Sequence, residues 1–404
     1  MTRPHVVLGV AGGIAAYKSV ELLRLLTESG YDVRVVPTAN ALRFVGLATW
    51  EALSGHPAPT DVWTDVHTVG HVAVGAGADL LVVAPATADL LAKAAHGLAD
   101  DLLTNTLLTA RCPVVFAPAM HTQMWEHPAT QANVVTLRAR GALVIDPAAG
   151  RLTGADSGVG RLPEPDELFA LCRRLIEAGT PSLDLAGRRI LVSAGGTREA
   201  LDPVRFLGNR SSGRQGYALA RTAVARGAEV TVVAANVALP DPAGAKVIRV
   251  TSAAEMHDVM LAEADAADAV VMAAAVADFR PADVAATKIK KAGGLPAPIE
   301  LTATADVLVD LVAHRAPGQV VVGFAAETGD DAAGVIEHGR EKLARKGCDL
   351  LVVNEVGERL GFESADNSAV VLGQDGTSTE IPPGSKESLA DAVWNLVVAR
   401  LNVA

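Results

Sequence analysis

The chain has 404 residues and a formal net charge of -11, and 50% of its residues are hydrophobic although only 3% are aromatic. This length suits two domains better than one, and the negative charge argues against non-specific binding to nucleic acid or to an acidic membrane surface. The three cysteines lie far apart without CxxC spacing, which argues against a disulfide framework or a zinc site and favours the reducing cytoplasm.

The apolar N-terminal stretch at 6–16 has a weak likeness to a signal peptide. Gly12 and Gly13 interrupt it, however, and an amphipathic helix pattern follows directly. It therefore predicts a strand, a turn and a helix rather than a targeting segment. No apolar run is long and continuous enough to predict a membrane span.

Short runs of Val, Leu and Ile bounded by Gly, Pro or Asp predict buried strands in the first half of the chain. A helix is expected at 14–29. The expected strands lie at 6–10, 32–37, 80–84, 114–117 and 143–146. Alternating strands and helices of this kind predict an α/β fold with a parallel sheet covered on both faces.

Candidate ligand residues in this half follow the predicted strands. Gly12 and Gly13 follow the first strand, Thr38 the second, Thr87 a later one, and Pro118-Ala119-Met120 the next. Ligands of such sheets bind at the carboxyl ends of the strands. The GxxGGI spacing at 9–14 is not the GxGxxG dinucleotide fingerprint, so it favours a mononucleotide over NAD.

The stretch Gly179-Thr180-Pro181-Ser182 interrupts a helix pattern and predicts a domain boundary. We therefore expect domains at 1–182 and 183–404. The second half repeats the pattern, with strands expected at 190–192, 230–234, 269–272, 320–323 and 350–353. The predicted fold is two tandem doubly wound parallel-sheet domains of the Rossmann or flavodoxin-like kind.

Two features of the second half predict an anion site. Gly195-Gly196-Thr197 forms a turn whose backbone N–H groups could meet a phosphate, and Ser211-Ser212-Gly213 stands before a helix pattern. Lys288, Lys290 and Lys291 form a basic loop that would suit a triphosphate, although such charge runs are usually solvated surface.

Several motifs carry a resemblance that covers essentially the whole chain. They are GGIAAYK at 12–18, APATAD at 84–89, PAM with QMW at 118–125, GGTREALDPVR at 195–205, AAAVADFRP at 273–281 and VGFAAET at 322–328. In this order they resemble the bifunctional enzymes of coenzyme A synthesis, in which phosphopantothenoylcysteine decarboxylase is fused to phosphopantothenate–cysteine ligase.

For the first half, the resemblance implies an FMN-dependent decarboxylase. FMN would lie across Gly12, Gly13, Thr38, Thr87 and Met120. His71 matches the catalytic histidine of the family, and His121 stands where the family has an asparagine that contacts the substrate carboxylate. A flavin suits this reaction, because oxidation of the carbon bearing the thiol creates the electron sink that loss of CO2 requires.

For the second half, the resemblance implies a ligase that uses CTP and Mg2+. The cation would neutralise the triphosphate, and no metal ligands can be named from the sequence. Asn209 matches the asparagine that acts on the acyl-cytidylate. The residues implied for CTP are Met272, Ala273, Ala274, Asp278, Phe279, Lys288, Ala305, Asp306, Val307, Leu308, Phe324, Lys342 and Lys346.

The resemblance also implies partners and leaves alternatives open. The substrates would be 4'-phosphopantothenate, cysteine and CTP, and the chain would form a homo-oligomer, with a dodecamer as the candidate size. The glycine-rich segment at 150–161 matches the family's substrate clamp but lacks its cysteine. The missing cysteine leaves open the hypothesis of an active ligase with an impaired decarboxylase half. Two further hypotheses remain, a non-catalytic flavoprotein and an NAD-type oxidoreductase.

Overall fold

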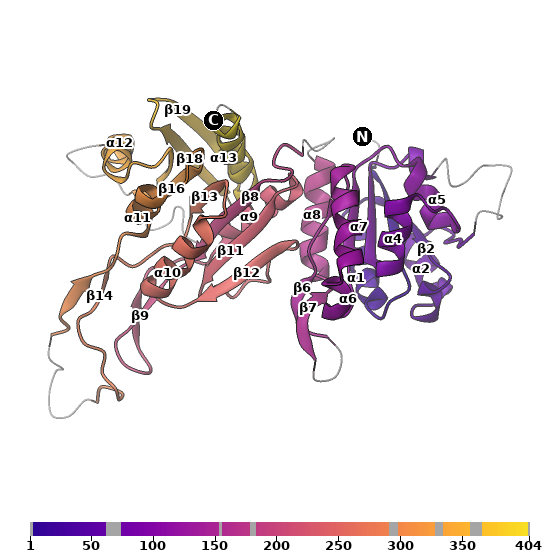
Figure 1. Cartoon of the computed structure of the whole chain (residues 1–404), viewed down its shortest axis with the longest axis horizontal. Coiled ribbons are helices and arrows are strands. Elements are labelled where there is room, and N and C mark those ends of the chain that lie inside the picture. Colours follow the sequence, from indigo (N-terminus) through magenta and orange to yellow (C-terminus); the bar gives the residue numbers. More distant parts are fainter. Residues whose placement is uncertain are drawn as a thin grey trace. The chain divides into compact units, whose positions relative to one another are not determined.

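The computed structural model describes residues 3–61, 74–152, 156–177, 183–290, 298–327, 334–355 and 366–402. The chain forms two compact units (Figure 1). Unit 1 comprises Met1–Leu183, Val224–Gly227 and Pro240–Ala245, and unit 2 comprises Asp184–Ala223, Ala228–Leu239 and Lys246–Ala404.

Unit 1 is built on a five-stranded sheet in the order β2-β1-β3-β4-β5. All of its neighbouring strands are parallel. The strands are β1 (His5–Val10), β2 (Asp32–Pro37), β3 (Leu80–Ala86), β4 (Val114–Pro118) and β5 (Leu143–Val144). This is the flavodoxin-like order, in which the chain reverses its direction of travel between β1 and β3 and leaves a crevice at their carboxyl ends.

Helices cover both faces of this sheet, because alternate residues of a buried strand point to opposite sides. Val7, Leu81 and Phe116 pack in one apolar cluster with residues of α4, α5 and α7, while α1 packs against α8 and α2. The helices are α1 (Ala16–Glu28), α2 (Leu47–Ser54), α4 (Ala88–His96), α5 (Leu102–Thr109), α6 (Thr122–Trp125), α7 (Pro128–Ala139) and α8 (Pro165–Glu177), with a 3-10 turn, η1, at Ala41–Arg43.

The second half carries an eight-stranded sheet in the order β12-β11-β8-β13-β16-β17-β18-β19. Its first six strands follow the Rossmann order 3-2-1-4-5-6. The strands are β8 (Arg189–Gly195), β11 (Glu229–Ala235), β12 (Ala245–Val250), β13 (Ala269–Met272), β16 (Val320–Glu327), β17 (Leu350–Glu355), β18 (Asp366–Gly373) and β19 (Ser378–Ser385). Strands β18 and β19 are antiparallel and extend one edge.

Helices of unit 2 also cover its sheet. One apolar cluster joins alternate strand residues to Met256 and Met260 of α10, Leu311 of α11 and Leu343 of α12. Helix α13 packs against α9 through buried Trp394, whose indole donates hydrogen bonds to Leu219 O (3.1 Å) and Thr222 Oγ1 (2.9 Å). The helices are α9 (Arg214–Ala225), α10 (Ala253–Ala264), α11 (Val307–His314), α12 (Val335–Lys346) and α13 (Lys386–Leu401).

Within the described ranges, three two-stranded sheets lie outside the main sheets. In unit 1, β6 (Ala148–Arg151) pairs antiparallel with β7 (Ser157–Arg161). In unit 2, β9 (Arg198–Ala200) pairs with β10 (Phe206–Gly208), and β14 (Phe279–Pro281) pairs with β15 (Leu301–Ala303). We call residues 198–208, 278–290 and 298–303 the arm; β9 and β14 lie along it in Figure 1.

The predicted fold class is confirmed, since each half holds a sheet of largely parallel strands with helices on its faces. Within this class the two sheets of the described residues differ in detail, because their strand orders differ and the second sheet is extended by the antiparallel strands β18 and β19. The glycine-rich segment at 150–161, which matches the family's substrate clamp, contributes to the β6–β7 hairpin. The predicted boundary stretch at 179–182 lies outside the described residues.

Candidate functional sites

The residues predicted for the flavin lie at one edge of the unit 1 sheet. Thr38 follows β2, Gly12 and Gly13 follow β1, Thr87 follows β3, and Met120 follows β4. Because these four strands are parallel neighbours in the sheet, their carboxyl ends lie side by side. The structure therefore brings together all five residues around the point at which the strand order reverses.

The Gly12-Gly13 turn is held close to its neighbours. The Ala11 amide donates to Pro85 O (3.1 Å), and the Thr38 amide donates to Val10 O (2.9 Å). A Cβ atom on Gly12 would lie 2.4 Å from Asn40 Cβ, so only glycine fits there. A Cβ atom on Gly13 would meet no atom nearer than Thr87 Cγ2 at 3.7 Å, so the protein itself leaves room beside Gly13.

This turn can bind an anion. In the described part of the chain, the amides of Gly12, Ile14 and Ala15 have no protein acceptor. They lie immediately before α1, whose N-terminus adds a partial positive charge. Thr38 Oγ1 accepts from the Ala41 amide (3.2 Å) and Thr87 Oγ1 from the Leu90 amide (3.3 Å), so each hydroxyl keeps its own hydrogen to donate. The residues present therefore fit the phosphate and polar groups of a flavin mononucleotide.

The β6–β7 hairpin lies against the strand end at Met120. The Met120 amide donates to Gly160 O (2.9 Å), and a Cβ atom on Gly160 would lie 2.1 Å from Met120 O. His121 is exposed beside this contact at the start of α6. At the base of the hairpin, buried Lys18 donates to Leu162 O (3.2 Å) and Glu164 Oε1 (3.1 Å). The hairpin is thus tied to both the Met120 strand end and α1.

Two predictions for unit 1 concern residues outside the ranges that the structure describes. His71 lies outside the described residues, as does the tip of the hairpin at 153–155.

Of the cysteines, Cys172 is buried on α8, and burial raises the pKa of its thiol to about 12. Cys112 precedes β4 and therefore lies at the sheet edge opposite Met120. Burial also raises the pKa of the Cys112 thiol. Neither cysteine belongs to the 150–161 segment.

In unit 2, Met272, Ala273 and Ala274 of the residues predicted for CTP lie at or directly after the carboxyl end of β13. Met272, the last residue of β13, pairs with Gly323 in the parallel ladder, so Ala273 follows β13 at the level of Phe324, which lies inside β16. The Thr304 amide donates to Asp278 O (3.0 Å), which brings the segment from Ala305 to Leu308 next to the Asp278 loop. The loop itself is fixed by Ser193 Oγ, which accepts from the Ala274 amide (3.0 Å).

Asn209 lies beside the same loop. Its Nδ2 donates to Val276 O (3.1 Å), and nearby Thr197 Oγ1 accepts from the Ala277 amide (2.9 Å). The structure therefore places the predicted catalytic asparagine against the loop that carries Asp278 and Phe279. The side chains of Asn209, Asp278 and Phe279 are exposed.

The three lysines that the resemblance implies for CTP lie on two elements. Lys342 and Lys346 are one turn apart on α12, and Lys346 forms an ion pair with Asp306 at the start of α11. Lys288 lies instead on the arm, with an exposed side chain and no protein partner among the described residues. The structure joins Lys346 to the 305–308 segment but leaves Lys288 on a separate element.

The predicted role of the Gly195-Gly196-Thr197 turn needs a correction. The Gly196 amide donates to Ala235 O (3.1 Å) and the Thr197 amide to Ala275 O (3.2 Å). These N–H groups join strand ends and are not free for a phosphate. The start of α9, directly after Ser211-Ser212-Gly213, is the remaining anion-binding candidate, because the first amides of a helix lack helical acceptors.

Two residues that position this site, Asn236 and Glu199, were not predicted from the sequence. Asn236 has a positive φ of 52°, and its Nδ2 donates to both Gly196 O and Thr251 O at 2.9 Å. Buried Glu199 accepts from the Ala253 amide (2.8 Å) at the start of α10. Neither residue is part of a recognisable sequence motif. The one signal that could have indicated them is that polar side chains stand next to predicted strand ends.

Over the described ranges, no group of three or more His, Cys, Asp or Glu side chains is arranged to hold a metal ion. Among the helices in those ranges, none combines the length and apolarity needed to cross a bilayer.

Two family models match the chain. Residues 1–177 match the Flavoprotein family, and residues 185–401 match the DNA/pantothenate metabolism flavoprotein C-terminal domain. Among curated proteins, the coenzyme A biosynthesis bifunctional protein CoaBC of Mycolicibacterium smegmatis is 58% identical, over 99% of this chain and 98% of that protein. The protein of the same name from Bacillus subtilis is 43% identical, over 99% of this chain and 98% of its own length.

Solved structures match each half. A crystal structure of the C-terminal domain of a coenzyme A biosynthesis bifunctional protein CoaBC is 34% identical, with a TM-score of 0.47, and covers 55% of this chain and 100% of that chain. The FMN-dependent cysteine decarboxylase SpaF is 38% identical, with a TM-score of 0.37, and covers 43% of this chain and 97% of that chain.

Proposed function

The chain belongs to the family of coenzyme A biosynthesis bifunctional proteins, and from this premise we propose how its two halves divide the work. The chain is an enzyme with two activities, phosphopantothenoylcysteine decarboxylase and phosphopantothenate–cysteine ligase. We assign decarboxylation to residues 1–182 and ligation to residues 183–404. The ligase product would then be the substrate of the decarboxylase, which explains why one chain carries both.

For the decarboxylase half, we propose FMN as the cofactor. The observation that supports it is the placement of Thr38, Gly12, Gly13, Thr87 and Met120 on four neighbouring parallel strand ends, with unpaired amides before α1. FMN would supply the two-electron oxidation of the carbon bearing the thiol that makes loss of CO2 possible.

The chain's own residues would orient the substrate and move protons. The amides of Gly12, Ile14 and Ala15 would hold the cofactor phosphate. His71 is proposed as the catalytic acid–base group, and exposed His121 as the contact for the substrate carboxylate. The β6–β7 hairpin, tied to Met120 and Lys18, would cover the substrate and exclude water.

For the ligase half, we propose carboxylate activation by CTP. The carboxylate of 4'-phosphopantothenate would attack the α-phosphorus of CTP and release pyrophosphate. The cysteine amine would then attack the acyl carbon of the acyl-cytidylate, lose a proton to solvent and release CMP. Lys342, Lys346 and Lys288 would bind the phosphates, and Asn209 would donate a hydrogen bond to the developing oxyanion. Mg2+ would enter with the triphosphate.

A second candidate, an active ligase beside an impaired decarboxylase, rests on one observation. No cysteine stands in the clamp segment at 150–161, and Cys112 and Cys172 lie elsewhere in unit 1. If a thiol were essential, CO2 release would be slow although flavin still bound. The two candidates differ only in the rate of the second reaction.

One assay separates these candidates. Protein, 4'-phosphopantothenate, cysteine, CTP and Mg2+ are mixed, and pyrophosphate and CO2 are followed separately. We expect equal yields of both in the wild-type protein, and loss of CO2 alone in His71→Asn. Pyrophosphate without CO2 in the wild type would favour the second candidate, and loss of both products in His71→Asn would contradict separate sites.

We also propose that the chain is a cytoplasmic homo-oligomer, with a dodecamer as the candidate size. Apolar side chains are exposed near both sites. Those of the flavin region are Ile14, Tyr17, Phe44 and Leu47, and those of the arm are Val204, Phe206, Phe279, Val284, Ile299 and Leu301. Exposed apolar surface of this extent typically marks a contact between proteins, and identical copies would cover it symmetrically.

A further inference from the structure

Asp202 is a nearly fully buried carboxylate on the arm, with 2% of its surface exposed. It lies in the turn between β9 and β10. Its Oδ1 accepts hydrogen bonds from the amides of Val204 and Arg205, both at 2.8 Å. One carboxylate oxygen therefore shapes the turn.

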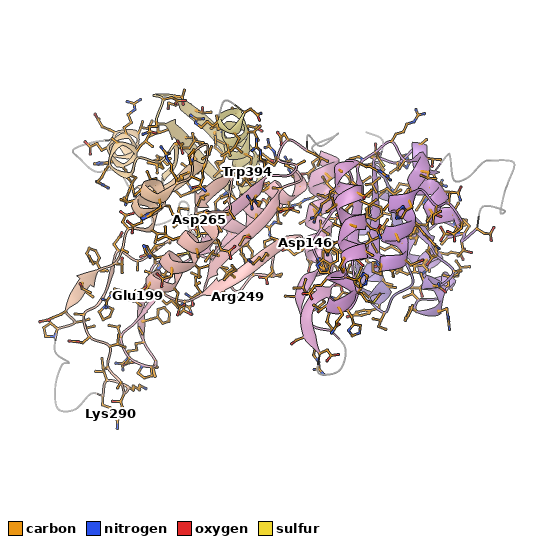
Figure 2. The ribbon with its side chains drawn as sticks, in the orientation of Figure 1. Asp146, Glu199, Arg249, Asp265, Lys290 and Trp394 are labelled. Atoms are coloured by element: carbon orange, nitrogen blue, oxygen red, sulfur yellow. The ribbon has the colours of Figure 1, made fainter. Side chains whose placement is uncertain are left out.

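The other oxygen reaches a distant segment. Asp202 Oδ2 accepts from the Ile289 amide at 3.1 Å, 87 residues along the chain. Four residues earlier, the Ala285 amide donates to Leu201 O at 3.0 Å. Two hydrogen bonds thus fasten the 285–289 segment to the turn, and Ile289 directly follows Lys288. Figure 2 shows the next residue, Lys290, at the far end of the arm, with Glu199 nearer its base.

The charge on Asp202 is maintained by its partners. Burial raises the pKa of this carboxyl, but the amides of Val204, Ile289 and Arg205 and the Arg205 guanidinium outweigh that effect, so its pKa lies below the usual range. The guanidinium is 3.4 Å from Oδ2. The carboxylate is therefore ionised at neutral pH and accepts charge-assisted hydrogen bonds, which are stronger than neutral ones.

The same turn leads to the predicted catalytic asparagine. Strand β10 runs from Phe206 to Gly208 and is followed at once by Asn209. Asp202 therefore connects the backbone beside Lys288 to the hairpin that carries Asn209. The exposed Lys288 side chain is left free to move, while the peptide next to it is fixed.

We infer that Asp202 is a positioning residue of the ligase reaction, which holds the Lys288 segment in a fixed place relative to the Asn209 hairpin. This inference rests on the proposed role of Lys288 in binding the triphosphate. The alternative is that Asp202 only stabilises the turn between β9 and β10. The two hypotheses differ in whether the effect of Asp202 on the ligase rate depends on Lys288.

The test compares Asp202→Asn, Lys288→Gln and the double variant in the full-length flavin-loaded protein. An asparagine side chain has one acceptor oxygen, so it can bond the turn or the Ile289 amide but not both. Asp375→Asn is the matched control, because Asp375 closes a similar turn (Thr377 amide to Oδ1, 3.1 Å) outside the arm.

We expect Asp202→Asn to lower kcat for pyrophosphate release by about tenfold to a hundredfold, since small misplacements of a binding group can cost that much. Hydrogen exchange at the Ile289 amide should become faster. In the Lys288→Gln background, Asp202→Asn should cause no further loss of rate. Decarboxylation of added 4'-phosphopantothenoylcysteine and all rates of Asp375→Asn should stay at wild-type values.

Ile289→Pro gives a second route if Asp202→Asn does not fold. It removes the donated hydrogen and leaves the carboxylate in place, and it should reproduce the loss of kcat. A normal rate in Asp202→Asn with Lys288→Gln slow would overturn the inference alone. A slow Asp202→Asn whose loss persists undiminished in the Lys288→Gln background would show a purely structural role. A normal rate in Lys288→Gln would instead remove Lys288 from the proposed function.

Discussion

Gly12 and Gly13 are neighbours in sequence, but the structure places different constraints on them. A side chain on Gly12 would collide with the Asn40 backbone and Cβ atom, at 3.0 and 2.4 Å. A side chain on Gly13 would meet only ordinary contacts from 3.7 Å outward. Glycine at position 12 is therefore required by the protein, whereas at position 13 the protein leaves room for a side chain, which is the room that the proposed flavin would need to approach the backbone.

We predict that Gly12→Ala and Gly13→Ala both lose flavin, but that only Gly12→Ala loses stability. Overpacking of this kind costs about 1–3 kcal/mol. Flavin absorbance per mole of purified protein, with thermal unfolding measured alongside, separates the two effects. A Gly13→Ala protein that keeps its full flavin content would exclude Gly13 from the flavin site.

Individual polar residues were the hardest part of the site to predict. The Gly195-Gly196-Thr197 turn has the composition of a phosphate loop, but two of its amides are taken by Ala235 O and Ala275 O across the sheet. Whether a backbone amide is already hydrogen-bonded depends on which strands become neighbours in the sheet, and the strand order could not be predicted from the sequence. Asp202 was missed for the same reason, since its partner Ile289 lies 87 residues away.

At the scale of elements, α10 and α11 are joined by one titratable pair. His257 Nε2 lies 3.0 Å from Asp310 Oδ2. Burial lowers the pKa of His257, but hydrogen bonds to Asp258 and Asp310 outweigh it, so the pKa is raised above the ordinary value of 6.5. A raised pKa means that the charged imidazolium stabilises the folded protein below pH 6.5, and that this contribution is lost as the pH rises through the folded-state pKa.

We therefore predict that His257→Gln destabilises the α10–α11 pair more at pH 5.5 than at pH 8.5. The difference should be below about 1 kcal/mol, because the pair is partly exposed. Hydrogen exchange of peptides from both helices, at each pH and after correction for intrinsic exchange, measures it. Equal destabilisation at the two pH values would show that the charge on His257 plays no part.

Most main-sheet strands followed from sequence patterns. Strands 32–37 and 269–272 were predicted at their observed bounds, because each is a buried apolar run with turn residues at its ends. The hairpins β6–β7, β9–β10 and β14–β15 were not predicted. Their residues are mostly exposed and lack alternating apolar positions, so periodicity gives no signal. Strands β18 and β19 were also missed; β19 holds Pro382 and Pro383, which fit only an edge strand.

At the scale of the whole molecule, the exposed apolar side chains of the arm predict an assembly. Val284→Asp with Ile299→Asp places two charges on that surface without touching a predicted ligand residue. We expect the oligomer to break into smaller species, because an uncompensated charge in an apolar interface is strongly unfavourable. Light scattering after size-exclusion chromatography measures the mass. A mass equal to that of the wild type would exclude this surface from the assembly.

The two main sheets place the predicted ligand sites in separate parts of the chain. Each sheet has a reversal of strand order, between β1 and β3 in unit 1 and between β8 and β13 in unit 2. The predicted flavin residues lie around the first point, and Met272, Ala273 and Ala274 of the predicted CTP set lie at the second. The proposed function therefore requires two separate sheet edges that hold two different mononucleotides.

A crystal structure of the full-length protein with FMN and an unreactive CTP analogue tests this claim most directly. We predict flavin density bounded by Gly13, Thr38 and Thr87, and cytidine density beside Ala273, Asp278 and Lys346. Flavin or cytidine density at any other place, with side chains packed across these two edges, would contradict the account.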